Sequence, residues 1–206
     1  MDSTQMAWRN HYCRRWARRE KIDDEPNNVV VRALRYVRGG RALDLGAGAG
    51  RDSLYLARNG FEVTAVDMAC SGIGRMNAVA SNESLPLRAI IGDISDFECA
   101  SQLSLIVSVL VLNHMPDAAA RSLIERIKLH VTDGGVCVVS TITKDSESYR
   151  LKPGRGLFYP GPGELRELFQ GWEILEYAEH NVPVSAGEWL ARPIENTETE
   201  LIARKI

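Results

Sequence analysis

A glycine-rich turn between two apolar strands constrains this chain more than any other feature of its sequence. Residues 41–67 read RALDLGAGAGRDSLYLARNGFEVTAVD, with glycines at positions 46, 48 and 50 and a final acid, Asp67. The apolar run before the turn predicts a strand, residues 52–58 a helix, and residues 61–66 a second strand. Because glycine has no Cβ, such a turn lets the backbone bend tightly and approach a ligand. The segment therefore predicts a strand–turn–helix–strand unit that holds a nucleoside.

The spacing of the glycines excludes two common nucleotide-binding motifs. A dinucleotide fingerprint, G-x-G-x-x-G, needs a third glycine where this chain has Arg51. A P-loop needs G-K-[ST] after the turn, and the chain has no such sequence there. The pattern is instead D-x-G-x-G-x-G, followed by an acid at the end of the next strand. This pattern resembles the S-adenosylmethionine site of class I methyltransferases.

That resemblance implies which residues bind the cofactor. In the family the glycine turn packs against the methionine part of the cofactor, and the acid after the second strand accepts both ribose hydroxyls. A carboxylate suits a vicinal diol because it accepts two charge-assisted hydrogen bonds. Arg51 has two open roles: it approaches the cofactor carboxylate or it braces the turn. The implied cofactor-binding residues in this part of the chain are Asp44, Gly46, Ala47, Gly48, Gly50, Arg51, Asp67 and Met68.

Three later segments follow in the order that this fold requires. Residues 87–91 predict a third strand that ends at Gly92-Asp93-Ile94. Class I methyltransferases place an acid there for the adenine amino group, with the next residue's amide nearby. The continuous apolar run 103–112 is typical of a central parallel strand buried on both faces. Residues 136–140, after two glycines, predict a fifth strand.

The remaining pattern predicts the rest of an α/β fold. Helices are expected over 4–20, 27–37, 72–82, from Pro116 onward and over 164–169, with strands over 172–177 and 200–205 and a long loop over 143–163. Alternating strands and helices predict a Rossmann-like class I methyltransferase fold. This is a central, mostly parallel seven-stranded sheet with helices on both faces and an N-terminal helical lid. We expect one domain over 1–206, with the lid over 1–38 and the core over 41–206.

The candidate residues should meet in one crevice. Ligands of such sheets bind beyond the carboxyl ends of the strands, where the strand order reverses. The glycine turn and Asp67 follow the first two strands, Asp93 and Ile94 follow the third, and Leu110 lies near the carboxyl end of the fourth. We therefore add Asp93, Ile94 and Leu110 to the cofactor-binding candidates.

His114, just after the fourth strand, is the catalytic candidate. Methyl transfer from a sulfonium is an in-line displacement that proceeds largely by positioning, so it does not require a strong acid or base. His114 is either a general base for an O–H or N–H acceptor or a residue that orients the loop, and both interpretations stay open. This segment lacks the N/D-P-P-Y/F/W tetrapeptide of methyltransferases that act on base or glutamine nitrogens. Its absence argues against adenine or cytosine amino methylation.

Two segments are candidates for covering the crevice. Trp8, Tyr12 and Trp16 recur at every fourth residue and form an aromatic stripe on the first helix. This stripe either closes over cofactor and substrate or packs against the body of the protein. The basic residues of the same helix fit a solvated face. The long loop carries Arg155 and Tyr159, and long loops in compact domains tend to be functional. The substrate-binding candidates are Tyr12, Trp16, Arg155 and Tyr159.

Composition limits the partners. The 206 residues carry a net charge of -2, so nothing in the overall balance calls for nucleic acid or an anionic membrane. No apolar run approaches the ~20 residues of a membrane span, and the N-terminus lacks a secretory signal. The four cysteines lie far apart in the sequence, which favours free thiols in the cytoplasm over a disulfide frame or a metal site. Both a monomer and a homodimer stay open.

A closer resemblance covers residues 27–206. The run RDSLYLA after the glycine turn, GEL before an aromatic WEILEY strand and a terminal LIARKI are similar to the tellurite-resistance methyltransferase family. In two places the chain departs from that family: Ala47 replaces a frequent cysteine of the turn, and residues 182–199 lack the usual charge pattern. The resemblance implies an S-adenosylmethionine-dependent methyltransferase of a small acceptor, either a secondary metabolite or a soft oxyanion such as tellurite or selenite.

Two other functions remain compatible with the sequence. The basic first helix could dock RNA or protein, so that the chain methylates a macromolecule, although the near-neutral net charge makes a nucleic-acid partner a minority interpretation. Alternatively, the chain keeps the crevice but transfers nothing and serves as a cofactor-binding sensor.

Overall fold

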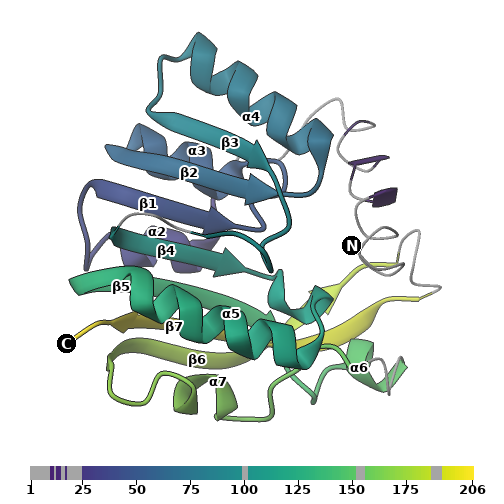
Figure 1. Ribbon diagram of the computed structural model, residues 1–206. Coiled ribbons are helices and arrows are strands. Elements are labelled where there is room, and N and C mark those ends of the chain that lie inside the picture. The colour runs from purple at the N-terminus through teal and green to yellow at the C-terminus, as the bar shows by residue number, and fades with distance from the viewer. Residues whose placement is uncertain are drawn as a thin grey trace.

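Seven strands form a single sheet in the order β3-β2-β1-β4-β5-β7-β6 (Figure 1). The computed structural model describes residues 10, 11, 13, 14, 17, 25–98, 102–151, 156–186 and 192–206. The strands are β1 (Gly40–Leu45), β2 (Phe61–Asp67), β3 (Leu87–Ile91), β4 (Leu103–Val109), β5 (Val131–Ile142), β6 (Glu173–Val184) and β7 (Ile194–Arg204).

The direction of the strands confirms the predicted Rossmann-like class I methyltransferase fold. Strands β1 to β5 run parallel, and β7 alone is antiparallel to both of its neighbours, β5 and β6. The chain moves outward from β1 to β3 and then returns to place β4 on the other side of β1. The order of the strands therefore reverses between β1 and β4. Ligands of open α/β sheets bind beyond the carboxyl ends at such a reversal.

Helices cover both faces of the sheet, as predicted. Helices α2 and α3 lie behind the sheet in Figure 1, and α5 and α7 lie in front of it. The described helices are α2 (Asn28–Ala33), α3 (Arg51–Arg58), α4 (Cys70–Asn82), the short 3-10 helix η1 (Leu112–His114), α5 (Asp117–His130), α6 (Glu147–Leu151) and α7 (Glu164–Glu167). None of the helices in these described segments has the length and hydropathy needed to cross a membrane.

Successive side chains of the central strands point to opposite faces of the sheet, so these strands contribute to two separate clusters of the core. On β4, Ile106 joins the cluster beneath α5, whereas Val107 joins the cluster beneath α2 and α3. The same alternation on β5 sends Cys137 to the first cluster and Val138 to the second. All four side chains are fully buried. Because both faces of these strands are covered, their sequence is a continuous apolar run and not an alternating one.

Several predicted boundaries are wrong, mostly in the second half of the chain. Strand β5 begins at Val131 and not at 136, since an irregularity in its pairing with β4 takes up the two glycines before Val136. Strands β6 and β7 extend over 173–184 and 194–204 and pair along their whole length, far beyond the predicted 172–177 and 200–205. The loop 143–163 contains α6, and helix α2 ends at 33 instead of 37.

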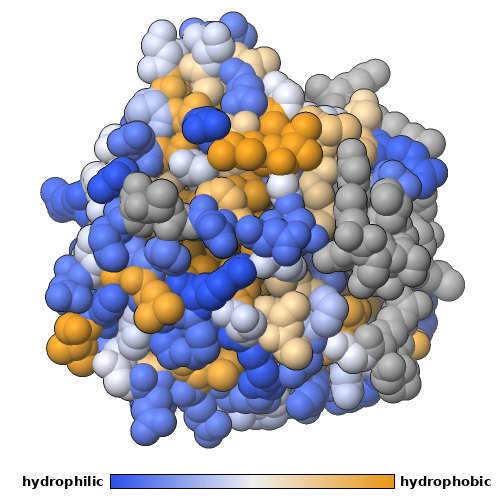
Figure 2. All heavy atoms as spheres, in the orientation of Figure 1, coloured by the Kyte–Doolittle hydropathy of each residue, from blue (hydrophilic) through white to orange (hydrophobic). Residues whose placement is uncertain are grey.

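The front face of the molecule is mostly polar. Figure 2 shows hydrophilic residues over much of this face, with an apolar patch above β3. Ile91, at the end of β3, is 54% exposed. It pairs with Asp67 in the register of β2 and β3. The carboxyl edge of the sheet therefore presents an apolar side chain on the strand next to Asp67.

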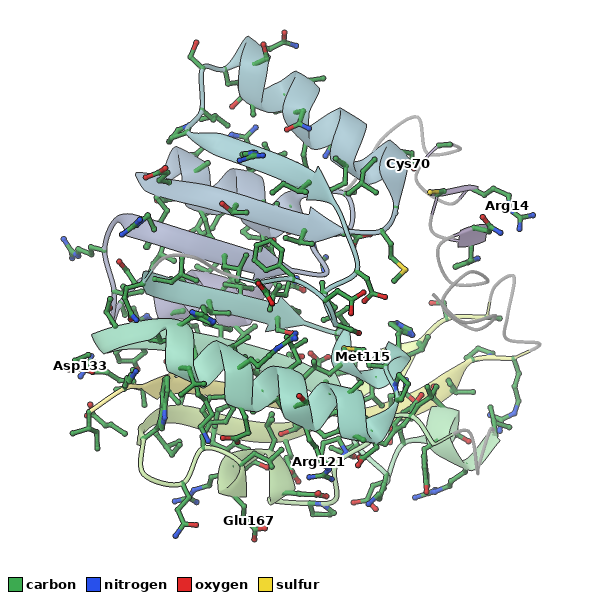
Figure 3. The ribbon with its side chains drawn as sticks, in the orientation of Figure 1. Arg14, Cys70, Met115, Arg121, Asp133 and Glu167 are labelled. Carbon is green, nitrogen blue, oxygen red and sulfur yellow. The ribbon has the colours of Figure 1, made fainter. Side chains whose placement is uncertain are left out.

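An arginine on α5 links that helix to α7 and to the loop before it. The Arg121 guanidinium, labelled in Figure 3, forms ion pairs with Asp117, at 2.7 Å, and with Glu164. It also lies over the Phe158 ring, 5.4 Å from the centroid. The Glu164 carboxylate accepts a second hydrogen bond, from the amide of Gly161 at 2.7 Å. Glu164, which the sequence places beside the long loop, therefore has a structural role.

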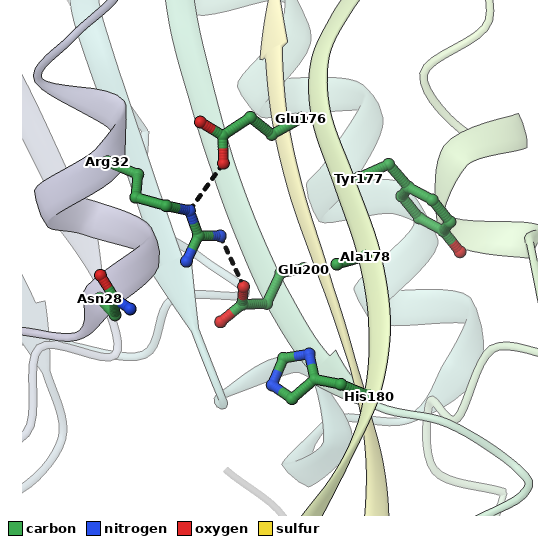
Figure 4. Close-up of a pocket in the computed structure, with 7 residues that line it drawn as sticks. All are labelled: Asn28, Arg32, Glu176, Tyr177, Ala178, His180 and Glu200. Atoms are coloured by element: carbon green, nitrogen blue, oxygen red, sulfur yellow. Dashed lines mark hydrogen bonds and ion pairs between the residues drawn. The ribbon is translucent and has the colours of Figure 1, made fainter.

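A second arginine links α2 to the edge of the sheet. Arg32 donates to Glu176 on β6 and to Glu200 on β7, each at 2.6 Å (Figure 4). The Tyr36 hydroxyl also donates to Glu176, at 2.9 Å. Although partial burial acts to raise it, these hydrogen bonds hold the pKa of Glu176 below its ordinary value. The pair lies in a pocket of about 430 Å³ lined by Asn28, Arg32, Glu176, Tyr177, Ala178, His180 and Glu200. Arg32 joins the two carboxylates that line this pocket, and it thereby attaches α2 to β6 and β7. We call this attachment the tether of α2 and assign the pocket to it.

We predict that Arg32→Ala destabilises the fold by about 1–2 kcal/mol, because it leaves Glu176 and Glu200 facing each other without a cation. The loss should shrink as the pH falls below roughly 4, since a carboxyl with a lowered pKa contributes stability above its ordinary pKa and loses it on protonation. Denaturant unfolding at several pH values measures the effect. The control is Arg58→Ala, which breaks an exposed pair with Glu83. Equal losses in the two variants would show that the tether of α2 contributes no more than an exposed ion pair.

Candidate functional site

The glycine turn lies at the carboxyl end of β1 and is held by the end of β2. The amides of Gly46 and Ala47 both donate to the carbonyl of Val66, at 2.8 and 3.2 Å. The Gly50 amide closes the turn by donating to the Ala47 carbonyl at 2.9 Å, and α3 begins at the next residue. Three backbone hydrogen bonds therefore fix the turn at the point where the strand order reverses.

Two of these glycines are required by backbone conformation and by space. Gly46 has φ 77° and Gly50 has φ 91°, in the region that side chains rarely allow. A Cβ on Gly46 would lie 2.4 Å from the Val111 side chain, and a Cβ on Gly50 would lie 2.1 Å from the Met76 side chain. The turn is therefore packed closely between the segment after β4 and helix α4.

Gly72, at the start of the helix expected over 72–82, is a third glycine with a spatial role. It lies in the first turn of α4, where a Cβ would come within 2.0 Å of the Gly48 carbonyl oxygen. Helix α4 thus rests directly on the backbone of the glycine turn. The sequence signal for this contact is the glycine itself. A glycine weakens a helix relative to alanine, so its presence in the first turn can mark a place where another group packs too closely for a side chain.

Asp67 joins the turn to the start of α4. Its two carboxylate oxygens accept one hydrogen bond each, from the amide of Gly48 at 2.8 Å and from the amide of Ala69 at 2.7 Å. Burial raises the pKa of Asp67, and the backbone hydrogen bonds oppose this shift. The Met68 amide also contributes a hydrogen bond that lowers this pKa, and an ionised carboxylate has about four acceptor positions, so part of its capacity stays unused. The side chain is half-buried, and its remaining acceptor capacity is available to a ligand.

Asp44 lies deeper than the sequence pattern suggests. Its side chain is 3% exposed and accepts a hydrogen bond from the Ser53 hydroxyl at 2.5 Å. Burial, reinforced by the negative charge of Asp52, raises the pKa of Asp44 to about 8. Because Asp44 has so little exposed surface, it supports the glycine turn indirectly, through its hydrogen bond with Ser53 in the first turn of α3. Ser53 was not predicted as part of the site.

Arg51 contacts the protein through Asn27. Its guanidinium donates to the Asn27 side-chain oxygen at 2.5 Å. Asn27 in turn donates to Asp52 from its backbone amide, at 2.7 Å, and from its side chain, at 2.5 Å. This network joins the start of α2 to the start of α3. Of the two roles considered for Arg51, the contact favours bracing the turn.

The segment after β3 meets Asp67 through the backbone. The Gly92 amide donates to the Asp67 carbonyl at 3.1 Å. One oxygen of the Asp93 side chain accepts from the Ser95 amide at 2.8 Å. The Ile94 side chain is 5% exposed and belongs to the core beneath α5, so only its backbone is placed to serve a ligand. Met68, beside Asp67, is half-buried.

The segment after β4 combines an unusual backbone with a buried polar atom. Leu110 has φ 54°, a left-handed conformation that costs a side-chain-bearing residue about 1–2 kcal/mol. Such residues cluster at functional sites. The next turn is η1, where Asn113 is 4% exposed and its Oδ1 has no hydrogen-bond partner among the described residues. The Asn113 side-chain nitrogen lies 3.5 Å from Nε2 of His114, which is half-buried.

The long loop reaches the same edge. The Phe158 amide donates to the Met115 carbonyl at 2.9 Å, which places residues 156–160 beside the segment that carries His114. Tyr159 is half-buried and packs against Tyr149 of α6, with ring centroids 5.2 Å apart. The other substrate-binding candidates lie outside the described residues, as does the first aromatic of the stripe: Trp8, Tyr12, Trp16 and Arg155.

We predict that Gly72→Ala destabilises the protein by about 1–3 kcal/mol, because the new methyl group meets backbone that cannot rotate away. Gly74→Ala is the matched control, two residues along the same helix, where a Cβ has open space. It should stabilise by about 0.4–1 kcal/mol through the unfolded chain. Thermal and denaturant unfolding of both variants test the prediction. A harmless Gly72→Ala would mean that α4 does not rest on the turn.

Known proteins resemble this chain in sequence. The family model for the tellurite resistance protein TehB matches residues 15–185. A probable S-adenosyl-L-methionine-dependent methyltransferase TehB from Haemophilus influenzae is 29% identical over 177 residues, which is 85% of this chain and 61% of that protein. The chain thus spans about three fifths of the length of that relative.

Solved structures show the same fold. The crystal structure of TehB from Haemophilus influenzae aligns with a TM-score of 0.77 and 26% identity over 96% of this chain and 67% of that one. The magnesium protoporphyrin IX methyltransferase ChlM from Synechocystis, crystallised with bound SAM, aligns with a TM-score of 0.68 at 15% identity over 100% and 99% of the two chains. Because the family model covers most of its length, this chain belongs to the TehB family.

Proposed function

We propose that this chain is an S-adenosylmethionine-dependent methyltransferase that transfers a methyl group to a small molecule. The observation that carries the proposal is that backbone amides of Gly48 and Ala69 donate hydrogen bonds to the Asp67 carboxylate at the end of β2. Backbone amides hold its carboxylate in one orientation, and the acceptor capacity that remains would serve the hydroxyl pair of a ribose. Family membership and the sheet topology support the same activity.

The residues at the carboxyl edge fit this cofactor. Asp67 would take both ribose hydroxyls, and the closely packed turn 46–50 would lie against the methionine part. Ile91 and Met68 offer apolar surface on either side of Asp67 for the adenine ring, with Asp93 and the Ile94 amide at its edge. Asp44 and Arg51 would position the turn from within the protein, through Ser53 and Asn27. Leu110 would place the segment after β4 beside the reacting group.

Positioning is the main catalytic task in this proposal. The bound cofactor supplies an electrophilic methyl group on a sulfonium. The protein must hold the acceptor in line with that methyl group and exclude water, which is worth up to ~7–11 kcal/mol when reacting atoms are well oriented. We propose that the N-terminal segment and the loop around Tyr159 cover the site and exclude water. The Phe158 amide holds this loop beside η1 by donating to the Met115 carbonyl. His114 would remove a proton only from an O–H or N–H acceptor.

A soft oxyanion is the acceptor class that we favour. The family is described by tellurite resistance, and a tellurium or selenium atom with a lone pair attacks a methyl group without first losing a proton. Such an acceptor needs no general base, so it suits a site in which positioning is the main catalytic task. Secondary metabolites with a hydroxyl or amine group form the second acceptor class.

Labelled S-adenosylmethionine tests the function. The purified chain is incubated with separate pools of chalcogen oxyanions, small metabolites, RNA and protein, and we expect label in a small-molecule pool. Label in RNA or protein would overturn the acceptor class, and tight cofactor binding without transfer to any pool would indicate a sensor. In the same assay, His114→Ala should leave the rate with an oxyanion unchanged when cofactor is saturating. A large loss with that acceptor would assign His114 a direct part in the transfer.

We predict that Asp67→Ala weakens the affinity for S-adenosylhomocysteine by about 1–3 kcal/mol, the usual scale for a lost hydrogen bond to a charged group. Because burial raises the pKa of Asp67, binding to the wild type should weaken with falling pH before an ordinary aspartate would protonate. Calorimetry over a range of pH values measures both effects.

Asp133→Ala is the control for that measurement. Asp133 is exposed and lies at the opposite edge of the sheet (Figure 3), so its loss should leave the affinity unchanged. Unchanged binding by Asp67→Ala would remove this residue from the ribose site. The melting temperature of each variant shows whether the turn still folds, since Asp67 also holds two backbone amides.

A further inference from the structure

Two cysteines that are 57 residues apart in the sequence meet beside the proposed cofactor site. The sulfur atoms of Cys13 and Cys70 lie 3.0 Å apart. Cys70 is exposed and is the first residue of α4, three positions after Asp67. Figure 3 shows it at the end of α4 that faces the N-terminal segment carrying Arg14. Cys13 is partly buried. Their distance in the sequence gave no sign of this contact.

Hydrogen bonds hold Cys13 in this position. The Cys70 amide donates to the Cys13 sulfur at 3.1 Å, and the Ser71 hydroxyl donates to the Cys13 carbonyl at 2.8 Å. The Cys13 sulfur also lies 4.0 Å from the Met68 carbonyl oxygen. The pair thus sits at the N-terminus of a 13-residue helix. The thiolate is the form of cysteine that reacts with oxidants.

The separation of the two sulfur atoms is close to bonding. Non-bonded carbon atoms rest about 3.5–4.0 Å apart, and a disulfide bond is about 2.04 Å long. At 3.0 Å, a movement of about 1 Å would join the two thiols. Cys137, in contrast to Cys13 and Cys70, is fully buried on β5, and burial raises the pKa of its thiol to about 12.

We propose that Cys13 and Cys70 form a reversible intramolecular disulfide on exposure to a peroxide. One thiolate attacks a peroxide oxygen and takes up a hydroxyl group, which yields a sulfenic acid and, with hydrogen peroxide, releases hydroxide that is protonated to water. The second thiol then attacks the sulfenic sulfur and expels a second water as the sulfur–sulfur bond forms. Two thiols are oxidised to one disulfide, and one hydrogen peroxide is reduced to two waters.

The bond would tie Cys13 to the residues that follow β2. Residues 67–71 carry the ribose acid, the start of α4 and one of the two sulfurs. Resting on the proposed function, the disulfide would restrict the movement of residues 67–71, which hold the ribose end of the cofactor. Oxidation would then slow the exchange of cofactor and product, and a thiol reductant would restore it.

Peptide mapping tests the covalent step on the whole chain. The protein is reduced, freed of reductant, treated with hydrogen peroxide, alkylated with N-ethylmaleimide and digested without reduction. We expect a linked peptide that joins Cys13 to Cys70 in a monomeric chain, and its disappearance after dithiothreitol. Cys70→Ser and Cys13→Ser should each abolish that peptide, whereas Cys137→Ser should retain it. Alkylated Cys13 and Cys70 after peroxide treatment, or a link between different chains, would overturn the proposal.

Release of S-adenosylhomocysteine tests the consequence. We expect several-fold slower dissociation from the oxidised wild type than from the reduced protein, with no effect of peroxide on Cys70→Ser. Equal dissociation rates in the two redox states would overturn the effect of the disulfide on cofactor release. A chain that forms the disulfide but binds no cofactor would instead overturn the proposed function, because the peptide map does not depend on binding.

Discussion

The carboxylate of Asp67 is the contact on which the carboxyl edge of the sheet depends. It ends β2, and it accepts one amide from the glycine turn and one from the start of α4, at 2.8 and 2.7 Å. Two loops that belong to different strands therefore share one anion. Because a carboxylate has more acceptor positions than these two amides use, the same group that holds the loops together can also meet a ligand. Structure and binding are thus combined in one side chain.

Close backbone packing explains why small residues surround that anion. Side chains at 46, 50 and 72 would collide with Val111, Met76 and the carbonyl of Gly48. The turn is therefore fixed from three sides: the segment after β4, the middle of α4 and the start of α4. Such packing lets the backbone approach a ligand while it stays rigid, which glycine alone allows at these distances. Leu110 lies at the same edge of the sheet, and its left-handed backbone is a further strained conformation of the kind found at functional sites.

The sequence predicted the parts of the fold that local patterns encode. The turn, Asp67 and the parallel strands β1 to β4 follow from glycine spacing and continuous apolar runs, and the structure confirms this order. The length of β6 and β7 could not be predicted, because their outer halves are polar and gain their pairing only from each other at the sheet edge. The partner of Arg51, the role of Gly72 and the meeting of Cys13 with Cys70 are tertiary contacts without a periodic signal.

The position of Cys70 has a thermodynamic consequence, because it shares a short rigid segment with Asp67. A disulfide that tightens the hold on the cofactor must, by linkage, become easier to form when the cofactor is bound, and by the same factor. The reverse also holds, since reduction would release the segment and weaken the grip. If both sites act as proposed, the redox state of the thiol pair and the occupancy of the crevice are coupled through residues 67–71, with no need for a longer path through the sheet.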